Sequence, residues 1–226
     1  MSLEETEFRP LIMAVPKGRI LGELMPLLSH AGIVPEADFA NEESRKLRFK
    51  TNDKALDIIR VRSFDVVTFV AFGGAQLGVT GDDVLSEFNY SEIYSPLDLG
   101  IGKCHLSLAE PAEMAPNDHP ATWSHVRIAT KYPEITRRHF AARGVHAECV
   151  KLNGALELAP SLGLSSRIVD LVSTGATLKA NGLIEVERIL DVTSRLVVNR
   201  TAMKTRADDM ATWIDRFKEA VRAKAS

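Results

Sequence analysis

The amino-acid sequence predicts an α/β protein in which helices connect parallel strands. Short apolar segments of strand length alternate along the chain with longer segments whose apolar residues recur at helical spacing. Two strand exits carry a Thr-Gly turn, at Thr80-Gly81 and at Thr174-Gly175, and a helix start follows each of them. This alternation is typical of βαβ units, whose ligands bind beyond the carboxyl ends of the strands.

The first predicted strand covers residues 11–15, and a helix follows it. Apolar residues of the next segment fall on one helical face, and Gly32 ends the helix. These apolar residues are Ile20, Leu24, Leu27, Leu28 and Ala31. Pro26 interrupts the segment, because proline lacks the backbone N–H that a helix interior requires.

The next two predicted strands each lead into a helix. Residues 56–62 predict the first of them, with Ser63 as the N-cap of the helix and the pair Gly73-Gly74 as its stop. Residues 77–85 predict a strand, a Thr-Gly turn and the start of another helix.

The second half of the chain continues the alternation. Residues 127–132 predict a strand, Pro133 suits the first position of the next helix, and Gly144 suits the position just after its end. Residues 145–152 and 167–173 predict strands of β-branched character.

The last part of the chain predicts two strands and a long helix. Residues 184–199 predict two short strands joined by a turn. From Asp208 onward, apolar residues at helical spacing form a stripe that faces the core. Residues 109–123 are the long irregular stretch of the sequence and predict a surface loop.

Length, composition and charge limit the function classes. The chain has 226 residues, enough for one large domain or two small ones, and its formal net charge of -2 gives no global field for nucleic acid. Cys104 and Cys149 show no ligand spacing and predict packed free thiols. The acidic start "MSLEETEF" disfavours a signal peptide, and no apolar run approaches the roughly 20 residues of a membrane span. We therefore expect a cytoplasmic protein.

The stretch from Asp170 to Leu183, "DLVSTGATLKANGL", has two interpretations. Ser173, Thr174 or Thr177 can cap a helix, which makes the stretch an ordinary turn. Exposed hydroxyl and amide groups where a strand leads into a helix also suit an anion such as a phosphate. The residues alone leave both interpretations open.

Two groups of basic residues are candidates for phosphate contacts. Lys17 and Arg19 flank a glycine in "PKGR" where a strand leads into a helix, although two solvated charges in a turn explain the pattern nearly as well. Residues 43–50 hold four basic residues and one acid, and a polar strand or hairpin face explains this cluster equally well. The four basic residues are Arg45, Lys46, Arg48 and Lys50.

Glu157 and Asp170 place carboxylates near the hydroxyl-rich turn. Acids beside a phosphate site can hold Mg²⁺ or bond ribose hydroxyls. The six histidines show no metal-binding spacing, and the sequence contains no Walker A, G-x-S-x-G or G-x-G-x-x-G motif.

Several separated stretches together resemble the ATP phosphoribosyltransferases, which open histidine biosynthesis. They run in order over nearly the whole chain: "AVPKGRI", "SRKLRF", "LGVTGDDVL", "LDLGIGKC", "RIATKYPEITRRHFAARGV", "KLNGALELAP" and "VDLVSTGATLKANGL". The resemblance implies two α/β lobes similar to type II periplasmic binding proteins, with the active site in the cleft between them. Lobe I would comprise residues 1–97 and 182–226. Lobe II, residues 98–181, would carry the phosphoribosyl pyrophosphate loop.

The implied reaction is Mg²⁺-dependent and transfers the phosphoribosyl group of phosphoribosyl pyrophosphate to N1 of ATP. The products are phosphoribosyl-ATP and pyrophosphate. Such a reaction needs no protein nucleophile, but it needs alignment of the ribosyl carbon and neutralisation of the departing pyrophosphate.

The resemblance also implies roles for particular residues. The 5-phosphate of the donor would bind to Ser173, Thr174, Gly175, Ala176 and Thr177. Glu157 and Asp170 would contact ribose hydroxyls, directly or through a Mg²⁺ held mainly by substrate phosphates. Lys17, Arg19 and Arg45 would meet nucleotide and pyrophosphate charges. Arg19 and Arg45 are the expected catalytic residues, with Arg45 stabilising the leaving group.

Partners follow from the resemblance as well. The chain ends without the C-terminal regulatory domain of the long form, so it resembles the short-form catalytic subunit. In that family the short form works with a histidyl-tRNA-synthetase-like regulatory subunit in a hetero-octamer, and we expect a homodimer as the catalytic core. We also expect inhibition by histidine to require the regulatory partner.

Three positions depart from the family pattern. Ala155 stands where serine is frequent, Gln76 where aspartate is common, and Asp82 where lysine is common. The first change removes a hydroxyl near the donor site. The last reverses a charge at a helix start, which should weaken anion binding there.

Two other function classes stay open. A non-catalytic solute-binding module can share the two-lobed fold, and a phosphoribosyltransferase for free nucleobases has a similar donor loop. The missing signal peptide counts against the former. The single Asp170, where the nucleobase enzymes carry two adjacent acids, counts against the latter.

Overall fold

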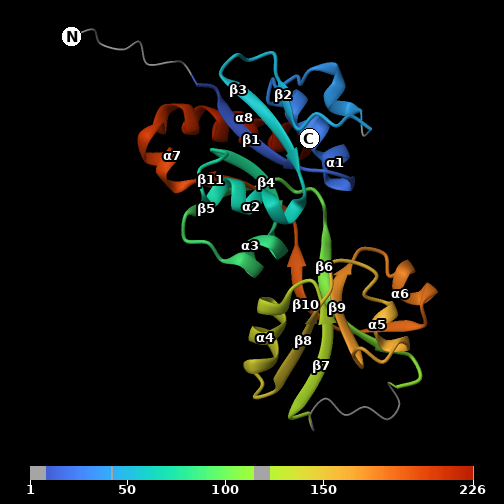
Figure 1. Ribbon diagram of the computed structural model, residues 1–226. Helices are drawn as coiled ribbons and strands as arrows, with labels where there is room; N and C mark the ends of the chain where they lie inside the picture. The colour runs from blue at the N-terminus through green and yellow to red at the C-terminus, as the bar shows by residue number, and fades with distance from the viewer. Residues whose placement is uncertain (1–8, 42, 115–122, 226) are drawn as a thin grey trace. The chain divides into compact units, whose positions relative to one another are not determined.

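A computed structural model describes residues 9–41, 43–114 and 123–225 (Figure 1). The chain divides into two units, each with its own sheet and helices. Unit 1 takes in the chain up to Val84, residues 90–102 and the chain from Thr193 onward. Unit 2 takes in residues 85–89 and 103–192.

Unit 1 is built on a six-stranded mixed sheet. The strand order is β2-β3-β1-β4-β11-β5, in which β1 pairs in parallel with β3 and β4, while β2 and β11 run antiparallel to their neighbours. The strands are β1 (Leu11–Pro16), β2 (Arg48–Lys50), β3 (Leu56–Val61), β4 (Leu77–Gly81), β5 (Ile93–Asp98) and β11 (Ser194–Asn199).

Helices cover both faces of this sheet because its strand residues alternate between two apolar faces. Met13 and Val15 belong to the core cluster that includes α1 and α8, whereas α2 packs on the other face against β1 and β4. The helical elements of unit 1 are α1 (Arg19–His30), η1 (Ala37–Ala40), α2 (Ser63–Ala71), the start of α3 (Asp82–Phe88), α7 (Arg200–Thr205) and α8 (Ala207–Ala225).

Gly78 in β4 allows α2 to approach the sheet closely. A Cβ atom added at Gly78 would lie 2.9 Å from Cγ1 of Val66 and 2.9 Å from Cγ2 of Val70. We expect Gly78→Ala to lower the free energy of unfolding by about 1–3 kcal/mol, because α2 must shift away from the sheet. Urea unfolding measures the difference. Gly22→Ala is the control, since Gly22 in α1 has no atom within 4 Å of an added Cβ; equal midpoints for parent and Gly78→Ala would contradict the packing argument.

Unit 2 is built on a five-stranded sheet of order β10-β6-β9-β7-β8. β7 pairs in parallel with β8 and β9, and β6 runs antiparallel to β9 and β10. The strands are β6 (Cys104–Pro111), β7 (His125–Thr130), β8 (His146–Lys151), β9 (Arg167–Val172) and β10 (Leu183–Val192), and the helices are α4 (Pro133–Ala141), α5 (Leu158–Ser161) and α6 (Ala176–Ala180).

The helices of unit 2 are fixed by apolar packing and by capping. Ala159 of α5 and Leu178 of α6 pack with Ile168 of β9 in one core cluster. At the start of α4, the buried carboxylate of Glu87 accepts hydrogen bonds from the backbone N–H groups of Glu134 and Ile135, each at 3.0 Å. A carboxylate in this position satisfies amide groups that have no partner inside the helix.

Most sequence-based elements are confirmed, with small shifts at their ends. The strand at residues 11–15 and the helix after it correspond to β1 and α1, and α1 continues through Pro26. Ser63 is the first residue of α2 and not its N-cap, which is Arg62. Pro133 does begin α4, as its fixed φ favours.

Three features differ from the expected arrangement. The sheets are mixed and not simply parallel. The two strands expected in residues 184–199 are present as β10 and β11, but they do not pair with each other: β10 pairs with β6 in unit 2, and β11 belongs to unit 1. Residues 98–102 belong to unit 1 and residues 182–192 to unit 2, whereas the expected lobe boundaries lie at 97/98 and 181/182.

The expected loop at residues 109–123 begins later than the sequence suggests, because β6 runs to Pro111. Residues 115–122 of that expectation lie outside the described residues. Cys104 and Cys149 are half-buried thiols, and burial raises the pKa of Cys149. Among the described residues, no helix is long and apolar enough to cross a membrane.

Candidate functional site

The turn between β9 and α6 forms the first candidate site. β9 ends at Val172, and Gly175 occupies the N-cap position of α6 with φ 73° and ψ 0°. This left-handed conformation favours glycine because a side chain would clash with the backbone there. The chain therefore reverses within Ser173, Thr174 and Gly175 and leaves their polar groups at the surface.

Most polar groups of this turn have no hydrogen-bond partner in the described part of the chain. The hydroxyls of Ser173 and Thr177 make no hydrogen bond within the described part of the chain, and the backbone N–H groups of Thr174, Gly175 and Thr177 donate to no backbone group there. The hydroxyl of Thr174 accepts a long hydrogen bond of 3.4 Å from the backbone N–H of Ala176. A cluster of free donors in a small space is the arrangement that binds an anion.

These donors line a pocket of about 160 Å³ in unit 2. The remaining walls come from Glu157, at the N-cap of α5, and from Asp170, Leu171 and Val172 at the end of β9. The lining of the pocket therefore includes both hydrogen-bond donors and two carboxylates.

Asp170 is the acid of this pocket whose pKa is raised. Burial, and to a smaller extent the negative charge of Glu157, raise its pKa to about 6. A hydrogen bond of 2.8 Å from the backbone N–H of Leu171 and the positive charge of Lys131 oppose the rise. Both carboxylates would be stabilised by a cation or by hydroxyl donors placed between them and the turn.

The donor set of this pocket fits a hard divalent cation in part. Two carboxylates, Glu157 and Asp170, supply the oxygen ligands that Mg²⁺ prefers. Within the described ranges no group of three or more His, Cys, Asp or Glu side chains could hold a metal ion. A cation bound here would thus take its other ligands from substrate or water.

Lys17 and Arg19 lie at the carboxyl end of β1, in unit 1. Gly18 between them has φ 84°, which opens the turn from β1 into α1. Both side chains are exposed, and Arg19 lies 3.5 Å from Glu23, one helical turn further on. This pair is a surface salt bridge that contributes little to stability and leaves the guanidinium accessible.

Arg45 lies near the same edge of the unit 1 sheet. Arg60 in β3 donates a backbone hydrogen bond of 2.9 Å to the carbonyl of Leu47 and a side-chain hydrogen bond of 3.2 Å to the carbonyl of Ser44. The residue after Arg60 pairs with the last residue of β1. The segment that carries Arg45 is therefore anchored beside the carboxyl ends of β3 and β1.

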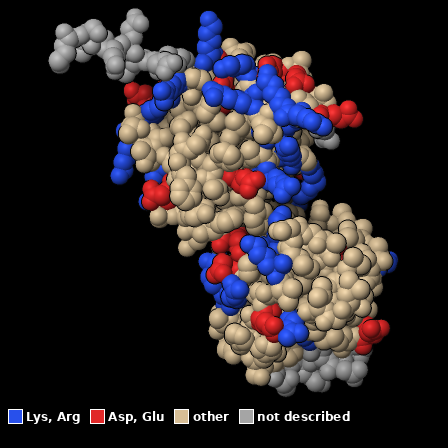
Figure 2. Space-filling view, viewed as in Figure 1, with Lys and Arg blue, Asp and Glu red and all other residues tan. Residues whose placement is uncertain are grey.

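Arg45 differs from the other basic residues of its cluster. Lys46 pairs with Glu36 at 2.5 Å, and both Arg48 and Lys50 pair with Asp57, at 2.7 and 2.9 Å. Arg45 is exposed and makes no ion pair in the described part of the chain. Figure 2 shows Lys and Arg side chains gathered over the part of unit 1 that carries β2 and β3.

The three departures from the family pattern have identifiable surroundings. The carboxylate of Asp82 receives hydrogen bonds of 2.9 and 3.0 Å from Nε of Arg195, which compensates its charge. Ala155 has φ 52° and does not line the pocket at the turn. Gln76 accepts a hydrogen bond of 2.9 Å from the backbone N–H of Ile12, at the opposite end of β1 from Lys17.

The structure thus brings one part of the predicted site together and leaves the other part in a separate unit. Glu157, Asp170 and the five turn residues line one pocket of unit 2. Lys17, Arg19 and Arg45 belong to unit 1, where Lys17 and Arg19 follow the carboxyl end of β1 and Arg45 lies in the segment bonded to Arg60 of β3. Sequence reasoning missed Lys131, whose charge acts on Asp170; its position just after β7, next to a predicted strand end, was the available signal.

Comparisons with known proteins identify the family of the chain. Residues 62–219 match the family model described as "HisG: ATP phosphoribosyltransferase". The chain is 68% identical to the ATP phosphoribosyltransferase of Rhodospirillum rubrum, covering 96% of this chain and 95% of that protein. It is 70% identical to that of Paramagnetospirillum magneticum, covering 93% and 96%.

Solved structures show the same fold. An ATP phosphoribosyl transferase (HisG:HisZ) complex from Thermotoga maritima matches with a TM-score of 0.79 and 31% identity, covering 94% of this chain and 99% of that one. The GluR0 ligand-binding core matches with a TM-score of 0.58 at 10% identity, covering 96% and 94%, a likeness of fold alone. The expected two-lobed, type II periplasmic-binding-protein fold is thereby confirmed.

Proposed function

The chain belongs to the ATP phosphoribosyltransferase family, and from that premise we propose which of its residues bind the two substrates. The enzyme transfers the phosphoribosyl group of phosphoribosyl pyrophosphate to N1 of ATP and releases pyrophosphate, the first step of histidine biosynthesis. The chemistry proceeds by direct displacement at the ribosyl carbon, so the protein must align the two substrates and stabilise charge.

The 5-phosphate of the donor binds at the turn from Ser173 to Thr177. The observation that carries this assignment is the small pocket lined by uncommitted hydroxyl and amide donors. A phosphate dianion accepts several such hydrogen bonds at once, and each is stronger than a bond between neutral groups.

Glu157 and Asp170 hold the ribose of the donor. Carboxylates bond the paired hydroxyls of a ribose directly, or they contact a Mg²⁺ ion whose other ligands are substrate phosphates. The bound ion would neutralise charge that builds up on the departing pyrophosphate. Burial of Asp170 and repulsion by the charge of Glu157 raise the pKa of Asp170. This supports the binding of a cation or of hydroxyl groups beside the two carboxylates.

Lys17, Arg19 and Arg45 bind the phosphate groups of ATP and of the leaving pyrophosphate. Their exposure at the carboxyl edge of the unit 1 sheet supports this role, since ligands of α/β sheets bind at that edge. Arg45 is assigned to leaving-group stabilisation, because its guanidinium has no carboxylate partner in the described part of the chain.

Replacing Thr174 or Thr177 with alanine is expected to lower kcat/KM for phosphoribosyl pyrophosphate by about tenfold, through the loss of one hydrogen bond to a charged phosphate. The Mg²⁺-dependent formation of phosphoribosyl-ATP, followed by its ultraviolet absorbance with pyrophosphatase present, measures this. Thr68→Ala is the matched control, because Thr68 is an exposed threonine of α2 in unit 1. An unchanged kcat/KM in both turn variants would contradict the assignment, and product from free nucleobases would indicate a different acceptor.

We also propose that the chain works in the cytoplasm, as a homodimer joined by a histidyl-tRNA-synthetase-like regulatory subunit into a hetero-octamer. The likeness to the chain from the HisG:HisZ complex supports the regulatory partner. Inhibition by histidine is then a property of the assembled complex. Histidine inhibition of the isolated chain would contradict this part of the proposal.

A further inference from the structure

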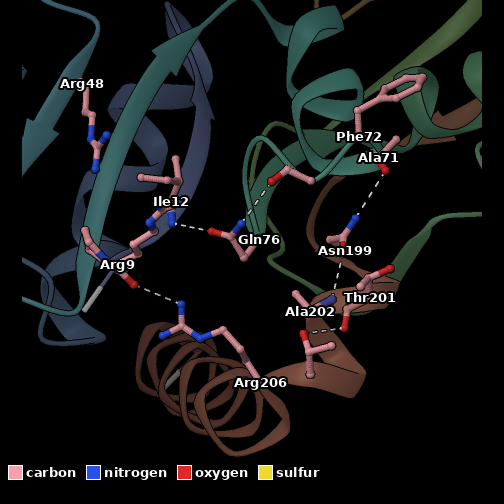
Figure 3. Close-up of a pocket in the computed structure, with 13 residues that line it drawn as sticks. Arg9, Ile12, Arg48, Ala71, Phe72, Gln76, Asn199, Thr201, Ala202 and Arg206 are labelled. Carbon is pink, nitrogen blue, oxygen red and sulfur yellow. Dashed lines mark hydrogen bonds between the residues drawn. The ribbon is translucent and has the colours of Figure 1, made fainter. Parts of the chain in front are cut away.

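A second pocket, of about 810 Å³, lies in unit 1 (Figure 3). Ile12 near the start of β1, Gln76 just before β4 and Asn199 at the end of β11 contribute to its walls. β1 runs from this pocket to Lys17, and a strand of this length spans roughly 20 Å. The pocket thus lies at the amino end of β1, whereas Lys17 and Arg19 follow its carboxyl end.

The charged residues that line this pocket are all basic. Arg9, Arg48 and Arg206 contribute to its walls, and no aspartate or glutamate does so among the described residues. In Figure 3, Arg9 and Arg48 lie on one side of the cavity, and Phe72 and Asn199 on the other. A concave surface with this bias attracts anions, because field lines concentrate where low-dielectric walls surround the charges.

The positive charge of Arg48 is only partly compensated. Asp57 is 2% exposed and its single carboxylate pairs with both Arg48 and Lys50. These three side chains together therefore keep one net positive charge. The side chain of Arg48 is 55% exposed, so its guanidinium remains accessible from the pocket.

Arg206 is held in place by its neighbours. Its Nε donates a hydrogen bond of 2.8 Å to Asp209, and its Nη1 donates one of 3.3 Å to the backbone carbonyl of Arg9. The two bonds fix the orientation of the guanidinium, and Figure 3 shows the one to Arg9. A pre-oriented guanidinium loses less entropy when it binds an anion.

The rest of the wall is fixed by side-chain amides. Gln76 accepts a hydrogen bond from the backbone N–H of Ile12 and donates one of 3.2 Å to the carbonyl of Gly73. Asn199 is buried, accepts a hydrogen bond from the backbone N–H of Ala202 and donates one to the carbonyl of Val70. The pocket is therefore a preformed feature of unit 1 and not a loose surface depression.

We propose that this pocket is a second anion site, distinct from the turn at Ser173 to Thr177, that binds a small organic molecule with two or more negative charges. Phosphate esters and polycarboxylates share this chemistry. The separated guanidinium groups match two charged groups on one ligand, and the 77% exposed ring of Phe72 supplies an apolar wall for its carbon skeleton.

Amide chemical shifts of the full chain test the site. The ¹⁵N-labelled protein is titrated at constant ionic strength with citrate, as the polycarboxylate, and with phenyl phosphate, as the phosphate ester. Saturable shifts are expected at Gly73, Gln76 and Ala202 with at least one of the two probes. The probe that binds more tightly identifies the ligand class, and Gly175 reports separately on binding at the turn.

Two substitutions and one control define the role of the arginines. Arg48→Gln leaves Asp57 paired with Lys50, so no buried carboxylate loses its only partner. We expect Arg48→Gln and Arg206→Gln each to raise the dissociation constant about tenfold. Arg200→Gln is the matched control, because Arg200 is an exposed arginine of α7 that does not line the pocket; its dissociation constant should change less than twofold.

Several results would overturn the proposal. Shifts that grow linearly without saturation would mean that no site exists. Shifts confined to Gly175 and its neighbours would place all anion binding at the turn. An unchanged dissociation constant in Arg48→Gln, with the variant still folded by its amide spectrum, would exclude the guanidinium from the site.

Discussion

Arg45→Ala lowers kcat by roughly a hundredfold when both substrates saturate the enzyme, if this arginine stabilises the leaving pyrophosphate. The charge on pyrophosphate increases as its bond to ribose breaks, so the guanidinium acts more strongly in the transition state than in the ground state. Steady-state rates of phosphoribosyl-ATP formation at saturating ATP and phosphoribosyl pyrophosphate measure the effect.

Two companion variants separate this role from a general loss of positive charge. Lys46→Ala removes the adjacent cation, which already pairs with Glu36, and should leave kcat within about twofold of the parent. Arg45→Lys keeps the charge but not the forked geometry, and should recover only part of the rate. If Arg45→Ala raised KM alone, with kcat intact, the residue would serve binding and not leaving-group stabilisation.

Asp170→Asn is expected to make the protein more stable at pH 8 and, at the same time, a poorer binder of phosphoribosyl pyrophosphate. The pKa of Asp170 is raised from 3.8 to about 6 in the folded protein, mainly by burial. As pH rises from 4 to 6, the unfolded chain loses this proton first, so the carboxyl group destabilises the fold increasingly until it is ionised in both states. Asparagine does not ionise and can still accept the hydrogen bond from Leu171.

Urea unfolding with a chelator present, at pH 4.5 and at pH 8, measures this effect. The stability advantage of the variant over the parent should be larger at pH 8 than at pH 4.5 by about 1–2 kcal/mol, because the carboxyl group of the unfolded parent is already largely ionised at pH 4.5. Loss of the carboxylate should also weaken donor binding by at least tenfold at pH 8, because a ribose contact or a metal ligand is removed. If the free energies of unfolding of variant and parent differed by the same amount at both pH values, burial would not disfavour the ionised form of Asp170.

Local sequence signals predict most of the elements and the turn between β9 and α6. The turn at Ser173 to Thr177 was recognised because its signals are adjacent in the chain: a strand end, hydroxyl residues and a glycine that can adopt positive φ. α1 was found from its apolar spacing even though Pro26 lies inside it. The rest of α1 packs Leu24, Leu27 and Leu28 into the core, which offsets the hydrogen bond that proline cannot make.

Long-range pairings could not be predicted in this way. The pairing of β10 with β6 does not follow from the sequence, because β6 lies about eighty residues earlier in the chain and no local pattern records which strand will pair. The charge of Asp82 was expected to weaken anion binding, but Arg195, more than a hundred residues away, compensates it. The pocket lined by Arg9, Arg48 and Arg206 was missed because its residues come from distant segments.

The position of β11 has a consequence for synthesis on the ribosome. β11 lies between β4 and β5, so the six-stranded sheet stays divided until residues 194–199 have been made. Residues 103–192 precede them, so the sheet of unit 2 can be complete before that of unit 1. Until β11 is made, β4 is therefore an unpaired edge strand of the unit 1 sheet. Nascent chains stalled before Ser194 should depend on chaperones more than full-length chains do.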